Sequence, residues 1–357
     1  MDLSELTIVC ITYDRPKFVA RLIDYWKKNF YDAKIFILDG SNSRLSQKYL
    51  NTINTKSITY IHLKNQSIFK RYCEIKNILN TKYFQLVADD EIFLRSGVEN
   101  CLNFLNKNHS YTACSGKMIL FTPLLNKEVF AFSPYNLYSN ENAIISERVK
   151  YWLQHSQPNT IYSISRSKNY LKILNEYVKF DENKFSKPEN FLEELIEIGL
   201  AFQGKTKILD NLMWLRSVEN ERIGLGEDKD RPEETLFDHN NKEKKIFFDN
   251  FIENYLNNLD ENFIGNELFS LKDEFYKRLN LIRDSKKKFL KKNFFGRFIF
   301  KFIPKKLKKI IRFYFRLNGL EIIKFLENNN KGIIFDREEI TEVKKFIINF
   351  YNDNFYK

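Results

Sequence analysis

The chain has 357 residues, of which 43% are hydrophobic and 16% aromatic, a composition too apolar for an intrinsically disordered protein. Its formal net charge of +12 would suit an anionic partner, but about thirteen Lys and Arg residues and no acidic ones fall between residues 286 and 316. The rest of the chain is therefore close to neutral, which excludes a basic surface spread over the whole protein. The length allows one large domain with an appendage, or two domains of modest size.

The four cysteines are scattered along the chain, with no C-x-x-C pair and no histidine at the spacing of a zinc site. We expect reduced, buried thiols, as in a cytoplasmic protein. The N-terminus is acidic and leads almost at once into an apolar segment that predicts a strand, so we expect no secretory signal peptide. No uncharged apolar run reaches the roughly 18 residues that a membrane span needs.

The first ninety residues alternate between short apolar runs and helical patterns. Apolar residues at helical spacing, such as Phe18, Leu22 and Trp26 after Pro16, indicate helices. The predicted strands are 6–12, 34–38, 58–63 and 83–88, and the predicted helices are 17–29, 43–54 and 68–79. This alternation favours an α/β fold with a mostly parallel, Rossmann-like sheet, flanking helices and right-handed crossovers.

Beyond residue 90 the pattern is less regular. The predicted helices are 97–106, 167–177 and 188–204, the predicted strands are 111–122, 162–165 and 207–215, and 126–142 is rich in loop signals. A polar stretch, 219–245, leads into C-terminal residues with helical patterns only. We therefore predict a first domain at residues 1–240 and a helical C-terminal region at 241–357.

Three consecutive acids, Asp89, Asp90 and Glu91, follow the predicted strand at 83–88. Open α/β sheets bind ligands at the carboxyl ends of their strands, and carboxylate oxygens suit Mg²⁺ and Mn²⁺. Acids at a strand end also cap following helices, and this alternative stays open. Repulsion among three adjacent carboxylates favours a cation or donor groups beside them.

Three segments resemble, in this order, the nucleotide-sugar-binding half of GT-A fold glycosyltransferases of the large family-2 type: LTIVCITYDRP at 6–16, IFILDGS at 35–41 and YFQLVADDE at 83–91. A later segment, GKTKILDNLMWLRSVEN at 204–220, is similar to one in a bacterial subfamily often found in surface-polysaccharide loci. The resemblance covers roughly residues 5–220. It implies a GT-A fold and transfer of a sugar from a nucleotide-sugar donor.

The resemblance also implies roles for the first two segments. Thr12 and Asp14 would lie by the nucleotide base and ribose, Arg15 would also bind the donor, and Asp39 would accept a hydrogen bond from the base. Capping of helices and turns is the alternative interpretation of these residue types.

Asp89-Asp90-Glu91 matches the D-x-D motif of these enzymes. Its middle acid tends to face the sugar or ribose and its third acid tends to ligate a metal. The resemblance therefore implies donor binding by Asp89 and Asp90 and a Mn²⁺ or Mg²⁺ ion held by Asp90 and Glu91. Glu91 stands where the family pattern prefers Asp, and its longer side chain reaches farther. His239, in LFDHN, is a candidate further metal ligand, the alternative being a solvated loop histidine.

Several basic residues are candidates for binding phosphate. Lys70 and Lys76 lie on the predicted helix 68–79, which by resemblance would flank the diphosphate, although a solvated helix face explains them equally well. Arg166, Arg216 and Arg222 are candidates to meet phosphate or an acidic acceptor, with surface ion pairs as the alternative.

Glycosyl transfer also needs a general base for the acceptor hydroxyl, which in inverting enzymes is usually an acid on a helix facing the donor. The predicted helix from Pro188 carries the candidates, Glu194 first and Glu193 second. We expect Glu193, Glu194 and Glu197 on its more exposed side. A solvated helix face is again the alternative.

Residues 286–318 alternate Lys and Arg clusters with Phe, Ile and Leu. After Pro304 the apolar residues fall on one helical face and the basic ones on the other, as in helices that lie in the interface of an anionic membrane. Packing on the chain's own core or in a homo-oligomer is a second interpretation. Nucleic acid is disfavoured as a partner, because a phosphate-binding helix does not need so many Phe and Ile side chains.

Together these patterns predict a cytoplasmic glycosyltransferase bound peripherally to the inner face of the cell membrane. It would move a sugar, with inversion, from a nucleotide-sugar to a glycan or lipid-linked acceptor in surface polysaccharide synthesis. A non-catalytic nucleotide-sugar- or glycan-binding module of the same fold is one alternative. A metal-dependent nucleotidyltransferase is another, although the Gly-rich phosphate loop typical of that class is missing from the N-terminal region.

Overall fold

The computed structural model describes residues 2–53, 56–123, 128–132, 137–155, 160–179, 189–217, 242–259, 320–328 and 332–354, together with Leu271 and Glu274. The strands are β1 (Leu6–Thr12), β2 (Lys34–Asp39), β3 (Ile58–His62), β4 (Tyr83–Ala88), β5 (Glu91–Phe93), β6 (Tyr111–Pro123), β7 (Val129–Phe132), β8 (Ile164–Arg166), β9 (Lys205–Ser217) and β10 (Leu320–Glu321). The helices are α1 (Pro16–Asn29), α2 (Gln47–Ile53), α3 (Ile68–Ile78), α4 (Arg95–Lys107), α5 (Ile145–His155), α6 (Ser167–Tyr177), α7 (Glu189–Gln203), α8 (Lys242–Leu259), α12 (Ile322–Asn328) and α13 (Arg337–Asn354), with a 3₁₀ turn η1 at Thr160–Tyr162.

The four strands of the N-terminal half are parallel and lie in the order β4-β1-β2-β3. The central strands β1 and β4 are buried and mostly apolar on both faces, as expected for strands covered by helices on each side, whereas the edge strand β3 is only partly buried. Thr12 at the end of β1 is in register with Asp39 at the end of β2, so the two strands end at the same edge of the sheet. The predicted α/β fold with a parallel sheet in this half is confirmed.

The second half of the sheet mixes directions. β8 is antiparallel to β4 and to β6, and β7 is antiparallel to β6. β9 runs parallel to β6 along its whole length and also pairs antiparallel with β5 at its C-terminal end. The long strand β9 therefore reaches from the middle of the sheet to the residues that follow β4. This connection brings the late segment of the sequence to Asp89-Asp90-Glu91.

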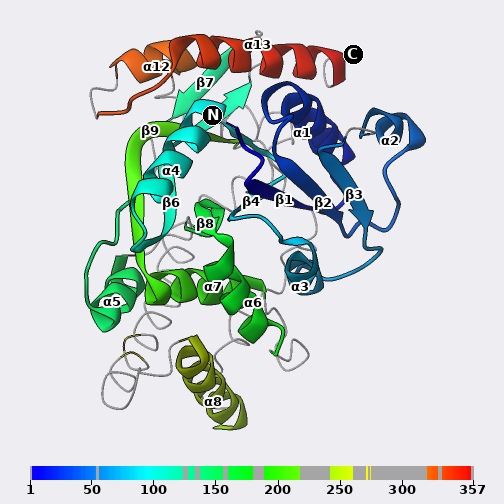
Figure 1. Ribbon diagram of the computed structural model, residues 1–357. Helices are drawn as coiled ribbons and strands as arrows, with labels where there is room; N and C mark the ends of the chain where they lie inside the picture. The colour runs from blue at the N-terminus through cyan, green and yellow to red at the C-terminus, as the bar shows by residue number, and fades with distance from the viewer. Residues whose placement is uncertain are drawn as a thin grey trace, which may run out of the picture.

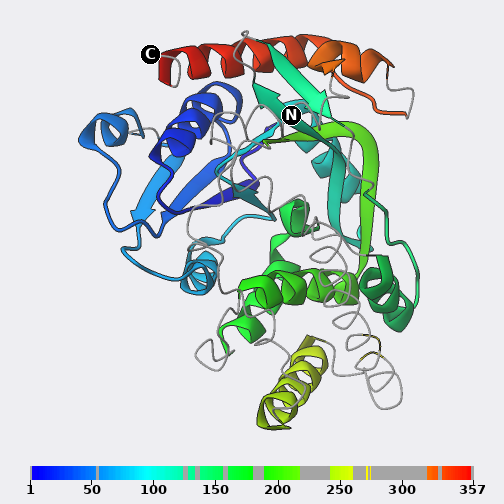
Figure 2. The same cartoon turned by 180° about the vertical axis from the view of Figure 1, so that it is seen from behind.

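Helices cover both faces of the sheet. Figures 1 and 2 show α1, α4, α12 and α13 on one side and α3, α6, α7 and α8 on the other. Each side has its own hydrophobic core, the first built around Trp26 and Trp214 and the second around Phe84 and Tyr170. Burial of each such large side chain stabilises the fold by about 1.5–3 kcal/mol. The predicted fold class, an α/β sheet flanked by helices with further helices at the C-terminal end, is confirmed.

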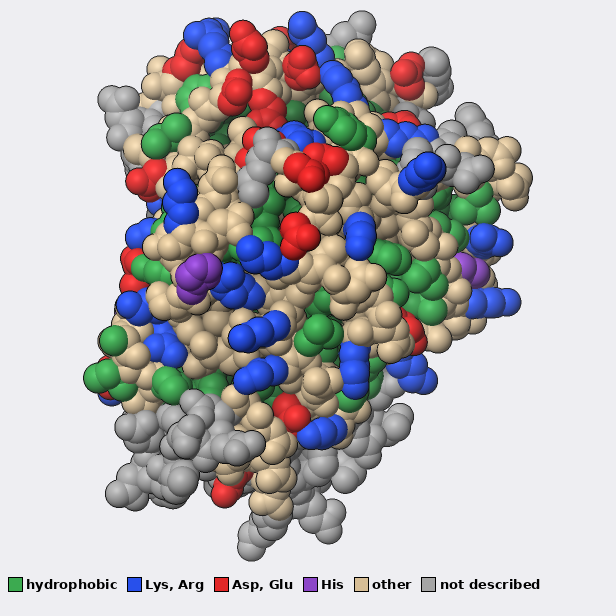
Figure 3. All heavy atoms as spheres, in the orientation of Figure 1, with side chains coloured by type: hydrophobic (Ala, Val, Ile, Leu, Met, Phe, Trp, Pro, Cys, Tyr) green, Lys and Arg blue, Asp and Glu red, His purple; other side chains and the backbone are tan. Residues whose placement is uncertain are grey.

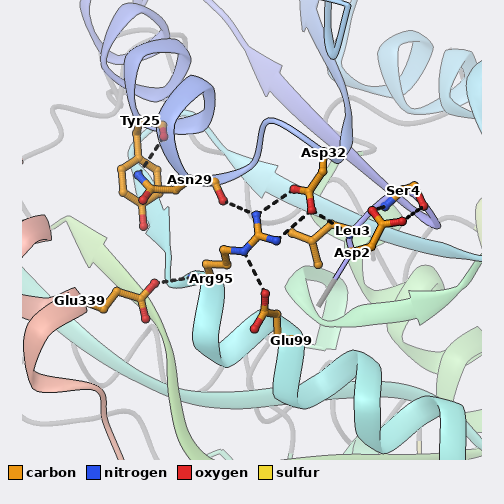
Figure 4. A network of polar contacts seen from close by, with 9 residues as sticks. All are labelled: Asp2, Leu3, Ser4, Tyr25, Asn29, Asp32, Arg95, Glu99 and Glu339. Carbon is orange, nitrogen blue, oxygen red and sulfur yellow. Dashed lines mark hydrogen bonds and ion pairs between the residues drawn. The ribbon is translucent and has the colours of Figure 1, made fainter.

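The C-terminal helix docks on the first half of the molecule through a polar network (Figure 4). Glu339 of α13 accepts hydrogen bonds from the backbone N–H groups of Arg95 and Ser96, at 2.6 and 3.4 Å, and so caps the N-terminus of α4. The Arg95 guanidinium in turn donates to both carboxylate oxygens of Asp32, each at 2.8 Å. Asp336 caps α13 itself by accepting from Glu338 N and Glu339 N.

These contacts correct the predicted boundary at residue 240. β10 pairs with β7 and extends the sheet, and α12 and α13 share the core that lies under α1 and α4. On the other face, Tyr255 of α8 donates to the Leu195 carbonyl oxygen at 2.7 Å. The described parts of the predicted C-terminal region are therefore layers of the same α/β unit. Their helical periodicity was visible in the sequence, but the surface on which they pack was not.

Charge on the face seen in Figure 3 is unevenly distributed. Lys and Arg side chains gather over its middle and lower part, while Asp and Glu gather toward the top, where α12 and α13 lie.

Three elements differ from the sequence prediction in ways that matter for the site. α2 begins at Gln47 instead of residue 43, and residues 43–46 line a pocket. β5 was not predicted, since a three-residue strand of which two are apolar gives no periodic signal. β7 and α5 lie within or next to the segment in which only loop was predicted.

Candidate functional site

A pocket of about 300 Å³ lies at the carboxyl ends of β1 and β2. Open α/β sheets bind ligands at this edge. The pocket is lined by Thr12, Asp14, Arg15, Pro16, Val19, Asp39, Ser41, Ser43, Arg44, Leu45, Ser46 and Tyr49. Four of the predicted donor-binding residues, Thr12, Asp14, Arg15 and Asp39, therefore surround one cavity.

Asp39 is 2% exposed and organises the loop that follows β2. Its Oδ1 accepts from Ser41 N at 2.9 Å and from the Ser41 hydroxyl, and its Oδ2 accepts from Tyr60 OH at 2.6 Å. Tyr60 OH also accepts from Leu45 N at 3.1 Å. Asp39 is thus a turn-capping residue in the pocket wall, the alternative that its residue type left open.

The turn between β1 and α1 places the TYDRP residues. Asp14 has a φ of 52°, a left-handed conformation that Asp adopts more readily than most residues, and its N–H donates to Ser41 Oγ at 2.8 Å. This turn joins the ends of β1 and β2 and directs Arg15 toward the residues after β4. Pro16 then starts α1, where its missing N–H costs no helical hydrogen bond.

Arg15 links the pocket to the acidic cluster. Its Nη1 donates to Asp89 Oδ1 at 2.8 Å and to Asp90 Oδ2 at 3.2 Å. Thr12 Oγ1 donates to the other oxygen of Asp89 at 2.7 Å. Burial raises the pKa of Asp89 to about 6, although the charge of Arg15 opposes this rise.

Glu91 is held differently. It is in register with Arg216 across the β5–β9 pair, and its Oε1 lies 3.5 Å from Arg216 Nε. Glu91 is 1% exposed, and its Oε2 has no hydrogen-bond donor among the described residues. Burial raises the pKa of Glu91 well above its usual range, while the Arg216 charge opposes the rise.

The acidic cluster fits a divalent ion poorly in this arrangement. Mg²⁺ and Mn²⁺ need several oxygen ligands that converge on one point. Asp89 and Asp90 instead bind the Arg15 guanidinium, and Glu91 faces Arg216. Within the described residues, no three His, Cys, Asp or Glu side chains lie close enough together to hold a metal ion. In this arrangement the described side chains do not form a set of ligands for the predicted Mn²⁺ or Mg²⁺ ion.

The basic helix α3 contributes a residue different from the two predicted ones. Lys70 and Lys76 are exposed, and Lys76 lies in the last turn, toward the opposite edge of the sheet. Arg71, in contrast, is buried and donates to the Thr12 carbonyl oxygen at 2.6 Å. A Cβ on Gly40 would lie 2.7 Å from Arg71 Nε, so the glycine lets this guanidinium pack against the end of β2. Arg71 therefore fixes the backbone of Thr12, which lines the pocket.

Arg166 does not belong to this site, which corrects its predicted role in donor binding. It pairs with Tyr83 at the start of β4, at the edge of the sheet opposite to Asp89. Its guanidinium donates to the carbonyl oxygens of Tyr111, Leu105 and Asn108, at 2.6–3.0 Å. Arg166 therefore satisfies the carbonyl groups at the C-terminal end of α4 and in the following turn.

Glu193 of α7 and the acidic cluster both influence Tyr162. Burial raises the pKa of Tyr162 well above its usual value, and the negative charges of Glu193, Glu91 and Asp90 raise it further while Arg216 opposes them. The Tyr162 ring also packs on Trp214, with ring centroids 5.3 Å apart. A single side chain thus lies within electrostatic reach of α7 and of the β5–β9 pair. Glu194, the other candidate base, lies next to Glu193 on α7.

Glu197 corrects the prediction that three acids share the exposed side of this helix. It is 0% exposed and accepts from Trp152 Nε1 at 2.7 Å and from Ile161 N at 3.1 Å. These donors come from α5 and from η1. They compensate for the loss of hydration of the carboxylate, and neither could be found from the helical spacing of the acids.

Some predictions concern residues outside the described ones. His239, Arg222 and the basic segment 286–318 belong to this group. Every helix that the structure describes is too short or too polar to cross a bilayer.

Comparison with solved structures gives distant similarities. The crystal structure of S. aureus TarS 1-349 matches with a TM-score of 0.48 and 13% identity, over 76% of this chain and 71% of that chain. The same TarS fragment in complex with UDP-GlcNAc matches with a TM-score of 0.46 and 13% identity, over 79% and 91% of the two chains. A CMP:2-keto-3-deoxy-manno-octonic acid synthetase complexed with CTP matches with a TM-score of 0.33 and 12% identity, over 59% and 90%. No protein-family model and no curated protein matches the sequence.

Proposed function

We propose that this protein is a GT-A glycosyltransferase that moves a sugar from a nucleotide-sugar donor to a glycan or lipid-linked acceptor. The observation that carries the proposal is the pocket at the ends of β1 and β2, whose wall includes Arg15, bound to Asp89 and Asp90. Its volume of about 300 Å³ suits a nucleoside. The motifs TYDRP, LDGS and ADDE, which carry the resemblance to GT-A enzymes, thus meet at one edge of the sheet.

In this proposal the nucleoside occupies the pocket and its diphosphate lies beside Arg15. The loop after Asp39 is held by Tyr60 and walls the pocket, so it shapes the space for the base. Arg44 lies in the same wall, with its guanidinium 5.8 Å from the centroid of the Tyr60 ring. The sugar then points from the diphosphate toward β5, Tyr162 and α7.

Transfer follows from this order of groups. The acceptor oxygen attacks the anomeric carbon of the donor, a new carbon–oxygen bond forms, and the bond from that carbon to the diphosphate oxygen breaks. The bonding electron pair leaves with the nucleoside diphosphate, and the proton of the acceptor hydroxyl passes to a carboxylate base. In-line attack from the side of α7 inverts the anomeric configuration.

Glu193 is the base in this proposal. Its negative charge raises the pKa of Tyr162, as do those of Glu91 and Asp90, which supports a place for Glu193 on the α7 side of the site. Its side chain is partly exposed, as a group that must meet an acceptor requires. Glu194 remains the alternative base from the sequence, and the two are separated by experiment below.

The remaining predictions about partners rest on the sequence. Residues 286–318 would bind an anionic membrane at its inner face, which would bring the enzyme to lipid-linked acceptors, and the same segment is the candidate contact for a homo-oligomer.

The proposal is tested with full-length protein and a panel of UDP-, GDP-, CMP- and dTDP-sugars. A ligand that binds the folded state raises the melting temperature by mass action, and at about 100 times its Kd it stabilises the fold by about 2.7 kcal/mol. We expect one nucleotide class to raise the melting temperature and the matching nucleotide-sugar to release free nucleotide on incubation. Binding without any turnover would favour the non-catalytic module. Release of pyrophosphate from a nucleoside triphosphate and a sugar phosphate would favour the nucleotidyltransferase, and no binding at all would contradict the proposed function.

A further inference from the structure

The three acids after β4 are each turned toward an arginine. Arg15 bridges Asp89 and Asp90, at 2.8 and 3.2 Å, and Arg216 lies 3.5 Å from Glu91. Asp89 and Asp90 form the turn between β4 and β5, and Glu91 begins β5, so the two guanidinium groups are held beside the same turn. Arg15 comes from the start of the chain and Arg216 from β9, which the fold brings together here.

This arrangement differs from that of a metal-binding carboxylate cluster. The side chain of Asp89 is 4% exposed, and both of its oxygens already accept hydrogen bonds, from Thr12 and Arg15. Glu91 is 1% exposed and in register with Arg216, so its carboxylate is turned into the β5–β9 pair. Convergence of these oxygens on one ion would break both arginine contacts.

The arginines are suited to the task that a metal would otherwise perform. A leaving diphosphate has to be neutralised, and guanidinium groups bind phosphate oxygens through planar, paired N–H donors. The side chain of Arg216 is 37% exposed while that of Glu91 is 1% exposed, and Arg15, at 14%, lies between Asp89, at 4%, and Asp90, at 17%. Arg216 thus lies on the accessible side of Glu91, and Arg15 covers the buried carboxylate of Asp89.

We propose that Arg15 and Arg216 bind the diphosphate of the donor directly, without a divalent ion, and that Asp89, Asp90 and Glu91 position these two arginines. The inference rests on the proposed function, since it assigns the phosphate contacts of that same site. In it Glu91 is a positioning residue, which accounts for a glutamate at a place where metal-binding relatives would prefer aspartate. No step needs a cofactor.

The test is calorimetric titration of the full-length protein with nucleoside diphosphates, once in excess EDTA and once in excess MnCl₂. We expect equal affinity in the two conditions. Arg216→Gln should weaken binding about 10- to 100-fold in EDTA, because it removes a charge-assisted contact. Arg216→Lys keeps the charge but lacks the planar pair of donors, so its affinity should lie between those of the wild type and Arg216→Gln. Arg337→Gln is the matched control, because Arg337 is exposed on α13 and pairs with Glu327.

The role of Glu91 is tested through its coupling to Arg216. Glu91→Gln should weaken binding in EDTA, and the double variant Glu91→Gln/Arg216→Gln should bind no more weakly than Arg216→Gln alone, since one side chain acts through the other. A purely structural role of Glu91 would make the two losses add, which would contradict the positioning role. Melting temperatures near that of the wild type verify that each variant is folded.

A gain in affinity of tenfold or more on addition of Mn²⁺ would overturn this inference while leaving the proposed function intact. Unchanged affinity in Arg216→Gln would overturn it as well. If no nucleoside diphosphate bound in either condition, both the inference and the proposed function would be wrong.

Discussion

Two walls of the site hold their buried carboxylates in opposite ways. Asp39, in the wall formed by β1 and β2, accepts hydrogen bonds on both oxygens from Ser41 and Tyr60, which lie within 21 residues of it in the chain. Glu91, in the wall formed by β5, β9 and α7, faces Arg216 from the far end of β9, and its Oε2 has no donor among the described residues. Local hydrogen bonds build a rigid wall that shapes the pocket, whereas the long-range charge pair presents the Arg216 guanidinium, 37% exposed, to a ligand. The first wall is therefore suited to binding the nucleoside and the second to acting on the bond that breaks.

The largest effect that separates the two walls is expected at Glu193. Replacement by Gln removes the proton acceptor without changing the size of the side chain, and loss of a general base lowers kcat about 10²- to 10⁴-fold. The affinity for the nucleoside diphosphate should stay within about twofold, because the nucleoside lies in the other wall. Turnover of the donor found in the nucleotide screen and calorimetric titration measure the two quantities.

Glu194→Gln is tested in parallel, because Glu194 is the alternative base on the same helix. Glu342→Gln is the control, because Glu342 is an exposed acid on α13. We expect both to keep kcat within a few-fold of the wild type. A large loss in Glu194→Gln with normal turnover in Glu193→Gln would move the base by one residue and contradict the proposal. A loss of nucleotide affinity in Glu193→Gln as large as its loss of kcat would show that the two walls are not separate in function.

Asp89, at the junction of the walls, gives a pH test of intermediate size. Burial raises its pKa to about 6 from the ordinary value of 3.8, so the folded protein binds its proton more tightly than the unfolded chain. The contribution of this group to stability is therefore present below about pH 4 and is lost as the pH rises through about 6. The shift corresponds to about 3 kcal/mol in the free energy of unfolding.

Urea unfolding of the wild type and of Asp89→Asn between pH 4 and pH 7 measures this difference. We expect the stability of the wild type to fall relative to that of Asp89→Asn as the pH rises, while Asp210→Asn, an exposed control, follows the wild type. A constant difference between wild type and Asp89→Asn over this range, or one that grows in favour of the wild type, would show that Asp89 is not held as the structure has it.

The contrast between the walls also explains how far the sequence could predict the site. The TYDRP, LDGS and ADDE residues act near the ends of neighbouring strands, so strand periodicity and parallel order were enough to bring Thr12, Asp39 and Asp89 together. Arg216 was a candidate for phosphate, but its pairing with Glu91 depends on the C-terminal end of β9 lying between β6 and β5. No local pattern encodes such a register.

The errors have the same origin. Arg166 is an arginine that follows a strand, which resembles a phosphate-binding position, yet β8 is antiparallel to β4 and therefore carries it to the opposite edge. Glu197 has the helical spacing of a solvated acid, but Trp152 from another helix supplies a donor in the core. Side-chain type and spacing identified candidates in the second half of the chain, and only the tertiary structure decided among them.

The smallest of the three effects is expected in the hydrogen-bonded wall, at Tyr60. Tyr60→Phe removes the donor to Asp39 Oδ2 and the acceptor for Leu45 N, and a lost hydrogen bond to a buried carboxylate costs about 1–2 kcal/mol. Tyr31→Phe makes the same chemical change at a side chain that is 65% exposed and should alter stability by less than about 0.5 kcal/mol.

Urea unfolding at neutral pH compares the stabilities of Tyr60→Phe and Tyr31→Phe, and titration with the nucleoside diphosphate shows whether the loop from Ser41 to Ser46 still shapes the pocket. We expect Tyr60→Phe to lose several-fold in affinity in EDTA and in MnCl₂ alike, because the loop is loosened while both arginines remain. If Tyr60→Phe matched Tyr31→Phe in both stability and affinity, Asp39 would not be organising this wall, and the distinction between a fixed wall and a charge-paired one would fail.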